Sequence, residues 1–399
     1  MKFSSKVQKC GLSPMRKFHP YAVAAQAKGR KIYHLNIGQP DIETPKAYFE
    51  AVRHFDLPVL EYAPSPGMPV LIDAVRQYDD KLDVHFDAGD ILITNGGSEA
   101  LQIAFNCILD DGDEILIPEP FYPNYNTMVR TCGASIHPIP TSPHEGYRYA
   151  DRARIEAEIN EHTRAIVCTN PGNPTGVVLT PEEMRMLVDV AKEHGLFIIG
   201  DEAYREFVYA GEPLQSMGQF ADAAENVIVI DTVSKRFSAC GARIGCLITR
   251  NRELMAHAMK YAQCRLSVPT LDQVAAAALY NVGPEYFAAV REEYKRRRDT
   301  VMQKLQAIPG VVCECPKGAF YVMAALPVDD ADAFQRWLLE EFQDNGDTVM
   351  YAPGSGFYAD PADGRSEIRI AYVHNCDYLR RAIQLLGKGI AAYNAKRGV

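Results

Sequence analysis

Residues 227–248 read VIVIDTVSKRFSACGARIGCLI, a stretch that begins and ends in apolar runs. These runs, Val227–Ile230 and Ile244–Ile248, do not alternate with polar residues. Strands that are apolar throughout are buried on both faces, as in a parallel sheet that helices cover on both sides. The polar turn between the runs carries Lys235 and Arg243. The stretch therefore predicts a central strand of an α/β sheet, followed by a loop suited to binding an anion.

The same pattern extends back to about Asp90. Short apolar runs alternate with segments whose apolar residues recur with helical spacing, which is typical of strands linked by helices. The helical stretches include Ser98–Leu109 and Pro181–His194. Thr180 and Glu183 form a predicted capping box at the start of the second stretch, and Gly195 follows its end. The further strands expected are Ile91–Thr94, Glu114–Ile117, Ala165–Thr169 and Leu196–Gly200.

The two ends of the chain show a looser alternation. At 399 residues the chain is longer than the roughly 250–300 residues at which one hydrophobic core stops growing, so we expect at least two lobes. The C-terminal part predicts a smaller α+β lobe that includes the N-terminal segment. Its expected strands are Phe320–Met323 and Glu367–Ala371, and its expected helices are Arg291–Gln306, Ala331–Phe342 and Tyr378–Tyr393.

Composition and charge exclude several classes of protein. With 42 basic and 51 acidic side chains the formal net charge is -9, which disfavours a nucleic-acid surface. No apolar run approaches the 18 residues or so of a membrane span, and the start of the chain lacks the apolar core of a signal peptide. Ten cysteines without CxxC spacing indicate reduced thiols in the cytoplasm. The ten histidines show no metal-ligand spacing, so we expect no metal site.

Polar groups follow several of the predicted strands, where open α/β sheets bind ligands. Lys235 follows one strand, Asp201 and Tyr204 end another, and Asn173 lies in the turn-rich NPGNPTG at 170–176. The segment TNGGSEAL at 94–101 joins a strand to a helix N-terminus, which offers free N–H groups to a phosphate. Taken singly, each of these segments also suits an ordinary turn, cap or exposed loop.

Together, the four segments resemble, in order and spacing, the signature of fold-type I pyridoxal-phosphate-dependent aminotransferases of class I/II. The resemblance runs from Asn36 to Arg369, and its most specific parts are SKRFSACGARIG at 234–245, NPGNPTG and the DEAY at 201–204. It implies a large domain with a mostly parallel, seven-stranded sheet covered by helices, and a smaller α+β domain. The implied limits are 1–44 for an N-terminal segment packed on the small domain, 45–290 for the large domain and 291–399 for the small domain.

The resemblance also implies roles for individual residues around pyridoxal phosphate. Lys235 forms the Schiff base and then shuttles a proton, and Asp201 pairs with the pyridine nitrogen. Tyr204 and Asn173 donate to the phenolic oxygen, and Tyr122 stacks on the ring. The phosphate is surrounded by Gly97, Ser98, Glu99, Thr232, Ser234 and Arg243, with Tyr62 supplied by the neighbouring subunit of a homodimer.

For the substrates, the resemblance implies an amino acid and a 2-oxo acid that react in two half-reactions with ping-pong kinetics. Arg369, helped by Gly38 and Asn173, grips the α-carboxylate. We expect aspartate as donor and 2-oxoglutarate as acceptor, and a buried second carboxylate then needs a second cation. Arg265 is the candidate, in the loop that approaches the neighbouring subunit's site. An exposed Arg265 and an aromatic amino donor are the alternatives.

Two other activities remain open at this stage. A lyase of sulfur amino acids, or a synthase that eliminates a β- or γ-leaving group, uses the same residues. A non-catalytic regulator on this fold carries an additional DNA-binding module, for which the residues before Asn36 leave too little room. Joint presence of Lys235, Asp201 and Arg369 favours catalysis.

Overall fold

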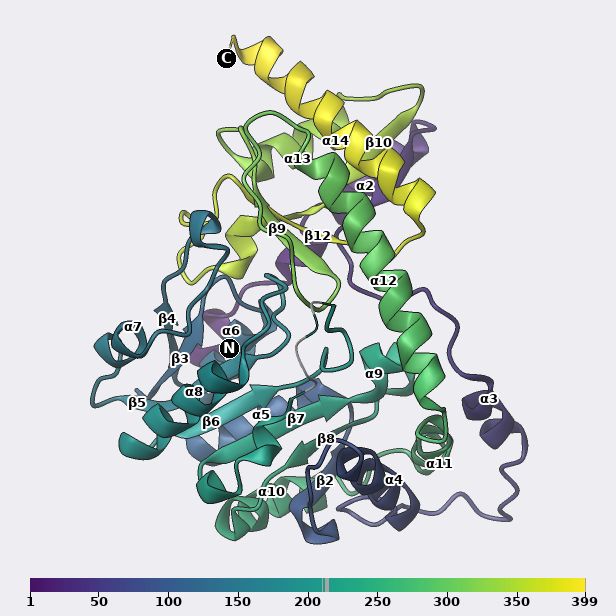
Figure 1. Ribbon diagram of the computed structural model, residues 1–399, viewed down its shortest axis with the longest axis vertical. Coiled ribbons are helices and arrows are strands. Elements are labelled where there is room, and N and C mark those ends of the chain that lie inside the picture. The colour runs from purple at the N-terminus through teal and green to yellow at the C-terminus, as the bar shows by residue number, and fades with distance from the viewer. Residues whose placement is uncertain (210, 212–214, 399) are drawn as a thin grey trace.

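The computed structural model describes residues 1–209, 211 and 215–398. Figure 1 shows a wide sheet with its helices in the lower half and smaller sheets in the upper half. The long helix α12 (Pro284–Leu305) runs between the two halves, so the expected boundary at residue 290 falls inside that helix. The described residues contain no helix long and apolar enough to cross a membrane.

The wide sheet has seven strands in the order β2-β8-β7-β6-β5-β3-β4. Strand β8 is antiparallel to its neighbours β2 and β7, and the other pairings are parallel. The prediction of an α/β fold with a mostly parallel sheet is confirmed. The strands are β2 (Ile91–Thr94), β3 (Glu114–Pro118), β4 (Ser135–Ile139), β5 (Thr163–Thr169), β6 (Phe197–Asp201), β7 (Val227–Thr232) and β8 (Gly245–Ile248).

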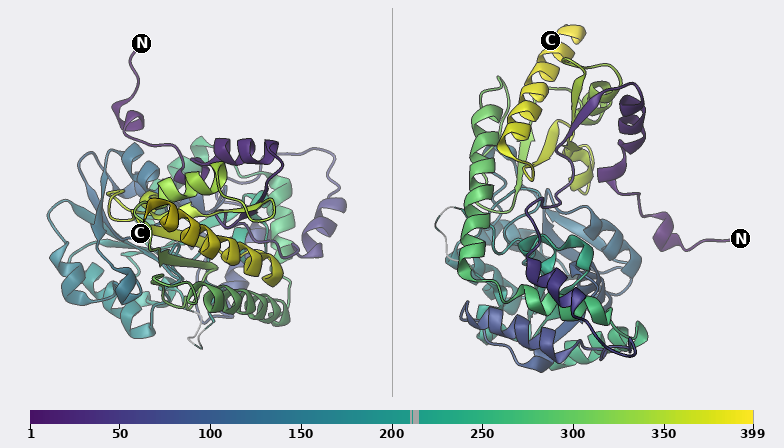
Figure 2. Two further views of the ribbon diagram at one scale, coloured as in Figure 1. Left: turned by 90° about the horizontal axis from the view of Figure 1, so that it is seen from above. Right: turned by 90° about the vertical axis from the view of Figure 1, so that its right-hand side faces the viewer.

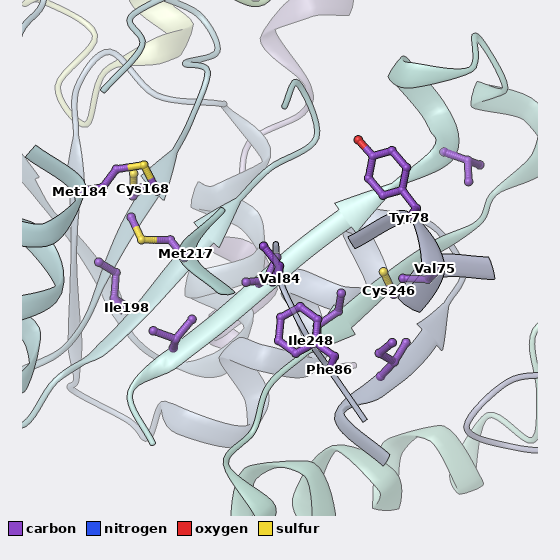
Figure 3. Close-up of a cluster of buried hydrophobic side chains, with 14 of the residues drawn as sticks. Val75, Tyr78, Val84, Phe86, Cys168, Met184, Ile198, Met217, Cys246 and Ile248 are labelled. Atoms are coloured by element: carbon purple, nitrogen blue, oxygen red, sulfur yellow. The ribbon is translucent and has the colours of Figure 1, made fainter. Parts of the chain in front are cut away.

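Successive residues of a strand point to opposite faces of the sheet. Both faces of this sheet carry apolar side chains, and helices cover both of them. Ile198 belongs to a buried core on one face that includes residues of α4, α8 and α11, and Ile199 belongs to a core on the other face that includes residues of α5, α6 and α10. Figure 3 shows part of the first core, with Met184 of α8 and Ile198 of β6 at the left and Val75 of α4 at the right. The helices around the sheet are α3 (Lys46–Arg53), α4 (Pro69–Asp80), α5 (Gly97–Ile108), α6 (Asn124–Cys132), α7 (Arg152–Ala157), α8 (Pro181–Glu193), α9 (Val233–Arg236), α10 (Arg252–Cys264) and α11 (Thr270–Leu279).

Helix α8 has the start and the end that its sequence predicted. The Thr180 side chain accepts from the Glu183 backbone N–H, and the Glu183 side chain accepts from the Thr180 N–H. Gly195, just after the helix, has a φ of 65°, which glycine adopts without steric cost.

The upper half combines segments from both ends of the chain. β1 (Lys31–His34) pairs in parallel with β10 (Asp347–Met350), which attaches the N-terminal segment to the C-terminal part. A second, antiparallel sheet has the order β11-β12-β9. Its strands are β11 (Ala352–Pro353), β12 (Glu367–Ala371) and β9 (Tyr321–Ala325), and the helices of this half are α2 (His19–Ala27), α13 (Ala331–Glu340) and α14 (Cys376–Arg397).

The first residues of the chain, with the short helix α1 (Ser5–Gln8), project from the body in both views of Figure 2. Short 3-10 helices join the main elements. They are η1 (Pro14–Arg16), η2 (Ala88–Asp90), η3 (Pro143–Glu145), η4 (Met217–Gln219), η5 (Ala221–Ala223), η6 (Cys240–Ala242) and η7 (Gly354–Phe357).

Candidate active site

A cavity of about 390 Å³ lies at the carboxyl ends of the parallel strands β5, β6 and β7. Thr169, Asp201 and Ile230 are neighbours in the sheet at this edge, so the polar residues that follow these strands lie close together. Residues of the N-terminal segment and of the upper half complete the walls. Predicted site residues that line the cavity are Gly38, Gly97, Ser98, Tyr122, Asn173, Asp201, Tyr204, Thr232, Ser234, Lys235, Arg243 and Arg369.

Lys235 lies in the one-turn helix α9, directly after β7. The Thr232 side chain caps this helix by accepting from the Ser234 backbone N–H. The Lys235 Nζ donates to the Gly38 carbonyl oxygen at 3.0 Å and lies 3.7 Å from the Cys240 Sγ. Within the described residues this amine has no carboxylate partner, so it is available for covalent chemistry.

Asp201 ends β6 and is only 7% exposed. Its carboxylate accepts from the Tyr125 hydroxyl at 2.7 Å and from the Ala203 backbone N–H at 3.2 Å. Burial raises the pKa of this carboxyl above its ordinary value. A protonated ring nitrogen in the cavity would supply the positive charge that a buried carboxylate requires.

Three side chains form a polar wall beside Asp201. The Tyr204 hydroxyl lies 2.9 Å from the Tyr321 hydroxyl and accepts from the Asn173 amide at 3.2 Å. Burial raises the pKa of Tyr204 well above its ordinary value, so its hydroxyl keeps its proton and can donate. This wall suits a ligand that presents an anionic oxygen.

Arg369 is on β12 in the upper half and is only 3% exposed. It donates to the Asn36 carbonyl oxygen at 2.8 Å and to the Asn173 Oδ1 at 3.1 Å, while its Nε has no partner. Burial lowers the pKa of this guanidinium, which forms no ion pair within the described residues. A buried guanidinium with an unused N–H is suited to a planar carboxylate.

The backbone at Gly38 comes close to this polar wall. A Cβ at Gly38 would lie 1.9 Å from the Tyr321 hydroxyl oxygen, so any side chain there would displace Tyr321. Because Gly38 has no side chain, its backbone can lie beside Tyr321 while its carbonyl oxygen accepts from Lys235.

The other end of the cavity suits a phosphate. Gly97 and Ser98 begin α5 and leave their backbone N–H groups at a helix N-terminus. The hydroxyls of Thr232 and Ser234 lie 2.8 Å apart on the facing wall. Arg243 donates to the Cys240 and Asn95 carbonyl oxygens, which leaves its positive charge without a carboxylate partner in the described chain.

Tyr122 also lines the cavity. Its ring meets Tyr125 edge to face, with centroids 5.5 Å apart, and its hydroxyl accepts from the Asn124 amide at 2.7 Å. Burial raises the pKa of Tyr122 to about 12, so the hydroxyl is neutral.

Three predicted site residues lie apart from the cavity lining in this single chain. Tyr62 is 79% exposed in a segment without regular structure. The Arg265 Nε pairs with Glu99 at 3.2 Å, and its Nη2 donates to the Ile93 carbonyl oxygen at 2.6 Å. The Glu99 side chain also accepts from the Asn95 N–H.

The residues of the cavity or its immediate support that sequence reasoning missed include Arg16, Cys240, Tyr321 and Tyr125. Tyr125 sits one helical turn beyond the predicted Tyr122, but only the fold brings its hydroxyl to Asp201. Tyr321 and Arg16 come from the small sheet and the N-terminal segment, and their sequence surroundings carry no motif for a site.

A buried ionic network supports the site from behind. The Arg205 guanidinium pairs with Asp79 and Glu202 at 2.7 Å each and lies 3.5 Å from Asp231. Arg236 pairs with the other oxygen of Asp231 and lies over the ring of Tyr78. Four network members are sequence neighbours of cavity residues: Glu202 follows Asp201, Arg205 follows Tyr204, Asp231 precedes Thr232 and Arg236 follows Lys235.

The charges of the cavity fit pyridoxal phosphate together with an anionic substrate. Four cationic side chains line it, Arg16, Lys235, Arg243 and Arg369, against the single carboxylate of Asp201. A phosphate, a substrate carboxylate and a protonated ring nitrogen would balance most of these charges. The unpartnered Nε of Arg369 supports the same fit.

Comparisons with known proteins agree with this geometry. The family model described as "Aminotransferase class I and II" matches residues 30–386. The chain is 30% identical to aspartate aminotransferase of Bacillus subtilis over 94% of this chain and 96% of the relative. It is 32% identical to a probable N-acetyl-LL-diaminopimelate aminotransferase of the same organism, over 96% and 94%. The structure of Thermus thermophilus aspartate aminotransferase with maleate superimposes with a TM-score of 0.86 at 28% identity, covering 98% of this chain and 100% of that one.

Proposed function

The chain belongs to the class I and II aminotransferases, and on that premise we propose that it moves the amino group of aspartate to 2-oxoglutarate. As a member of this family it is a transaminase that depends on pyridoxal phosphate. The relatives carry different substrate names, so the donor and the acceptor are the part that we propose. The observation that carries the proposal is the excess of cations in the cavity, which favours a substrate with two carboxylates.

The residues of the chain divide the work of amino transfer. When bound, pyridoxal phosphate supplies an electron sink for the bond broken at the substrate Cα. Asp201 keeps the ring nitrogen protonated, and Tyr204 and Asn173 donate to the phenolic oxygen. Arg369 holds the α-carboxylate and so orients the Cα–H bond. Lys235 would then move the proton taken from the substrate Cα, acting as general base when it accepts the proton and as general acid when it returns it.

The phosphate end and Tyr122 fix the position of the cofactor. Gly97, Ser98 and the backbone of Glu99, the hydroxyls of Thr232 and Ser234, and Arg243 surround the phosphate in this proposal. Tyr122 covers one face of the ring. Thr232 ends β7, and the helices that begin with Gly97 and carry Ser234 start shortly after β2 and β7, so these groups would hold the cofactor in a fixed position. The same residues would serve both half-reactions. The first product would leave this one site before the second substrate binds, which gives ping-pong kinetics.

We also propose a homodimer in which Tyr62 of each subunit reaches the phosphate site of the other. The support is a segment of exposed apolar side chains around Tyr62, which a monomer would leave in water. Leu57 is 55% exposed, Val59 62% and Leu60 66%. The proposed domain limits stay 1–44, 45–290 and 291–399. The ten free cysteines support a cytoplasmic location, and we propose a role in amino-acid biosynthesis there.

The test is a panel of amino acids added singly to the holoenzyme, followed by the absorbance of the bound cofactor. Aspartate and glutamate should convert the cofactor to its amino form with kcat/KM at least about tenfold above those of alanine and phenylalanine. A preference for tyrosine or phenylalanine would refute the aspartate assignment. Release of pyruvate and ammonia without an added 2-oxo acid would instead indicate a lyase.

A further inference from the structure

Arg16 is the one cation of the cavity lining without a role in the proposed reaction. Lys235 is committed to proton transfer, Arg243 to the phosphate and Arg369 to the α-carboxylate. Arg16, at the end of η1, contributes to the same cavity from the N-terminal segment. Within the described part of the chain its guanidinium has neither an ion pair nor a hydrogen bond. A cation at a ligand cavity that is not used by the fold is available to a ligand.

The neighbours of Arg16 hold the backbone in place without its help. Pro14 packs against Gly356 so closely that a Cβ at Gly356 would come within 2.4 Å of it. The Met15 Sδ accepts from the Arg369 Nη2 at 3.4 Å. Lys17 pairs with Asp332 of α13, and Phe18 is buried against α2 and α13.

These anchors have a geometrical consequence for the substrate. Met15 touches the guanidinium that holds the α-carboxylate, and Arg16 is the next residue along the chain. The fixed turn therefore places a second cation near Arg369, on the N-terminal wall of the cavity. Ser13 and Asn124 line the same cavity and add polar groups that a carboxylate can accept from.

We infer that Arg16 is the specificity-determining residue that pairs with the side-chain carboxylate of a dicarboxylic amino acid or 2-oxo acid. The inference deepens the proposed function and rests on it. Aspartate and 2-oxoglutarate both carry a second carboxylate, so one cation serves both half-reactions. Arg265, the candidate from the sequence, already pairs with Glu99 in its own subunit, whereas Arg16 has no such partner in the described chain.

Arg16 is exposed at the cavity wall, which sets the expected size of its effect. An arginine that water still reaches gains less from a carboxylate than a buried one. A charge-assisted hydrogen bond of this kind corresponds to a change of about 10- to 100-fold in a binding constant. Because the second carboxylate is remote from the reacting carbon, its loss should act on KM more than on kcat.

The test compares the holoenzyme with Arg16→Gln, Arg16→Lys and the control Lys17→Gln. The control removes the same charge one residue away, at a side chain that pairs with Asp332. Succinate and butyrate serve as probes, because both have four carbons and differ in one carboxylate. Their dissociation constants are measured from the absorbance change of the bound cofactor, and thermal unfolding verifies that each variant is folded.

Arg16→Gln should weaken succinate binding by about 10- to 100-fold and change butyrate binding by less than about twofold. Lys17→Gln should change neither, and Arg16→Lys should recover part of the succinate affinity. Equal weakening of both probes, or succinate that binds the wild type no better than butyrate, would overturn the role of Arg16. If the wild type binds succinate through Arg16 but does not accept aspartate, the proposed donor fails and the role of Arg16 stands.

Discussion

Replacing Arg205 by methionine should lower the free energy of unfolding by about 3–5 kcal/mol. Arg205 is fully buried and pairs with Asp79 and Glu202 at 2.7 Å each, with Asp231 at 3.5 Å. Methionine keeps much of the apolar volume, so the loss comes from the charges and not from a cavity. Removing one partner of a buried ion pair leaves a carboxylate without compensation, which is the origin of this large cost.

The loss should also depend on pH. Burial raises the pKa of Asp79 and raises that of Glu202 to about 7, and the Arg205 charge opposes both increases. An acid whose pKa is higher in the folded state than in the unfolded state stabilises the fold while protonated, and this stability is lost as the pH rises through the folded pKa. Without Arg205 both pKa values rise further. The penalty of Arg205→Met should therefore be larger at pH 8.5 than at pH 6.5.

The assay is urea unfolding of the holoenzyme at both pH values, followed by circular dichroism. Arg152→Met is the matched control, because Arg152 also pairs with two carboxylates, Glu156 at 2.7 Å and Glu193 at 2.8 Å, but on the surface. Exposed pairs contribute about 0–1 kcal/mol, so the control should barely shift the unfolding midpoint. If Arg205→Met and Arg152→Met shift the midpoint equally, and the shift of Arg205→Met does not depend on pH, the reasoning is refuted.

Three further predictions concern the proposed site. Lys235→Ala should lower kcat for amino transfer by about 10²–10⁴-fold or more, while the cofactor should stay bound through dialysis. Turnover like that of the wild type would contradict the role of Lys235 as the proton-transfer base. Arg243→Gln should raise the dissociation constant of pyridoxal phosphate by about tenfold or more in an absorbance titration, and an unchanged constant would remove Arg243 from the phosphate site. Mixing Lys235→Ala with Tyr62→Ala subunits in equal amounts should recover about a quarter of wild-type activity, because half of the dimers then contain one intact site. No recovery after verified subunit exchange would exclude the shared site.

Much of the large sheet was predictable because its strands are buried on both faces. The predicted runs Ile91–Thr94 and Val227–Ile230 lie within β2 and β7, and the predicted helix at 181–194 is α8. The strand β4 was missed, since His137 and Pro138 interrupt its apolar pattern at the edge of the sheet. The pairing of β1 with β10 was also not evident, because short strands far apart in sequence carry no local signal for each other.

The site residues likewise fall into a predictable group and an unpredictable group. The groups at strand ends, such as Asp201 and Lys235, were predictable because a parallel sheet gathers the carboxyl ends of its strands. Arg16, Tyr125 and Tyr321 were not, because their place at the cavity depends on the packing of helices and sheets against each other. Arg265 illustrates the limit: the sequence offered an arginine, but only the structure shows its pairing with Glu99.

The ionic network behind the site restricts the register in which the strands of the large sheet can pair. At two strand ends a cavity residue and a network residue are neighbours in the sequence: Asp201 precedes Glu202, and Asp231 precedes Thr232. A strand that pairs one residue out of register turns every side chain to the opposite face of the sheet. Such a slip in β7 would move the Asp231 carboxylate to the cavity side and leave Arg205 and Arg236 without it. A chain with this register error would therefore contain several unpaired buried charges, which lower the free energy of unfolding. A one-residue deletion in β7 should prevent folding rather than merely reduce activity.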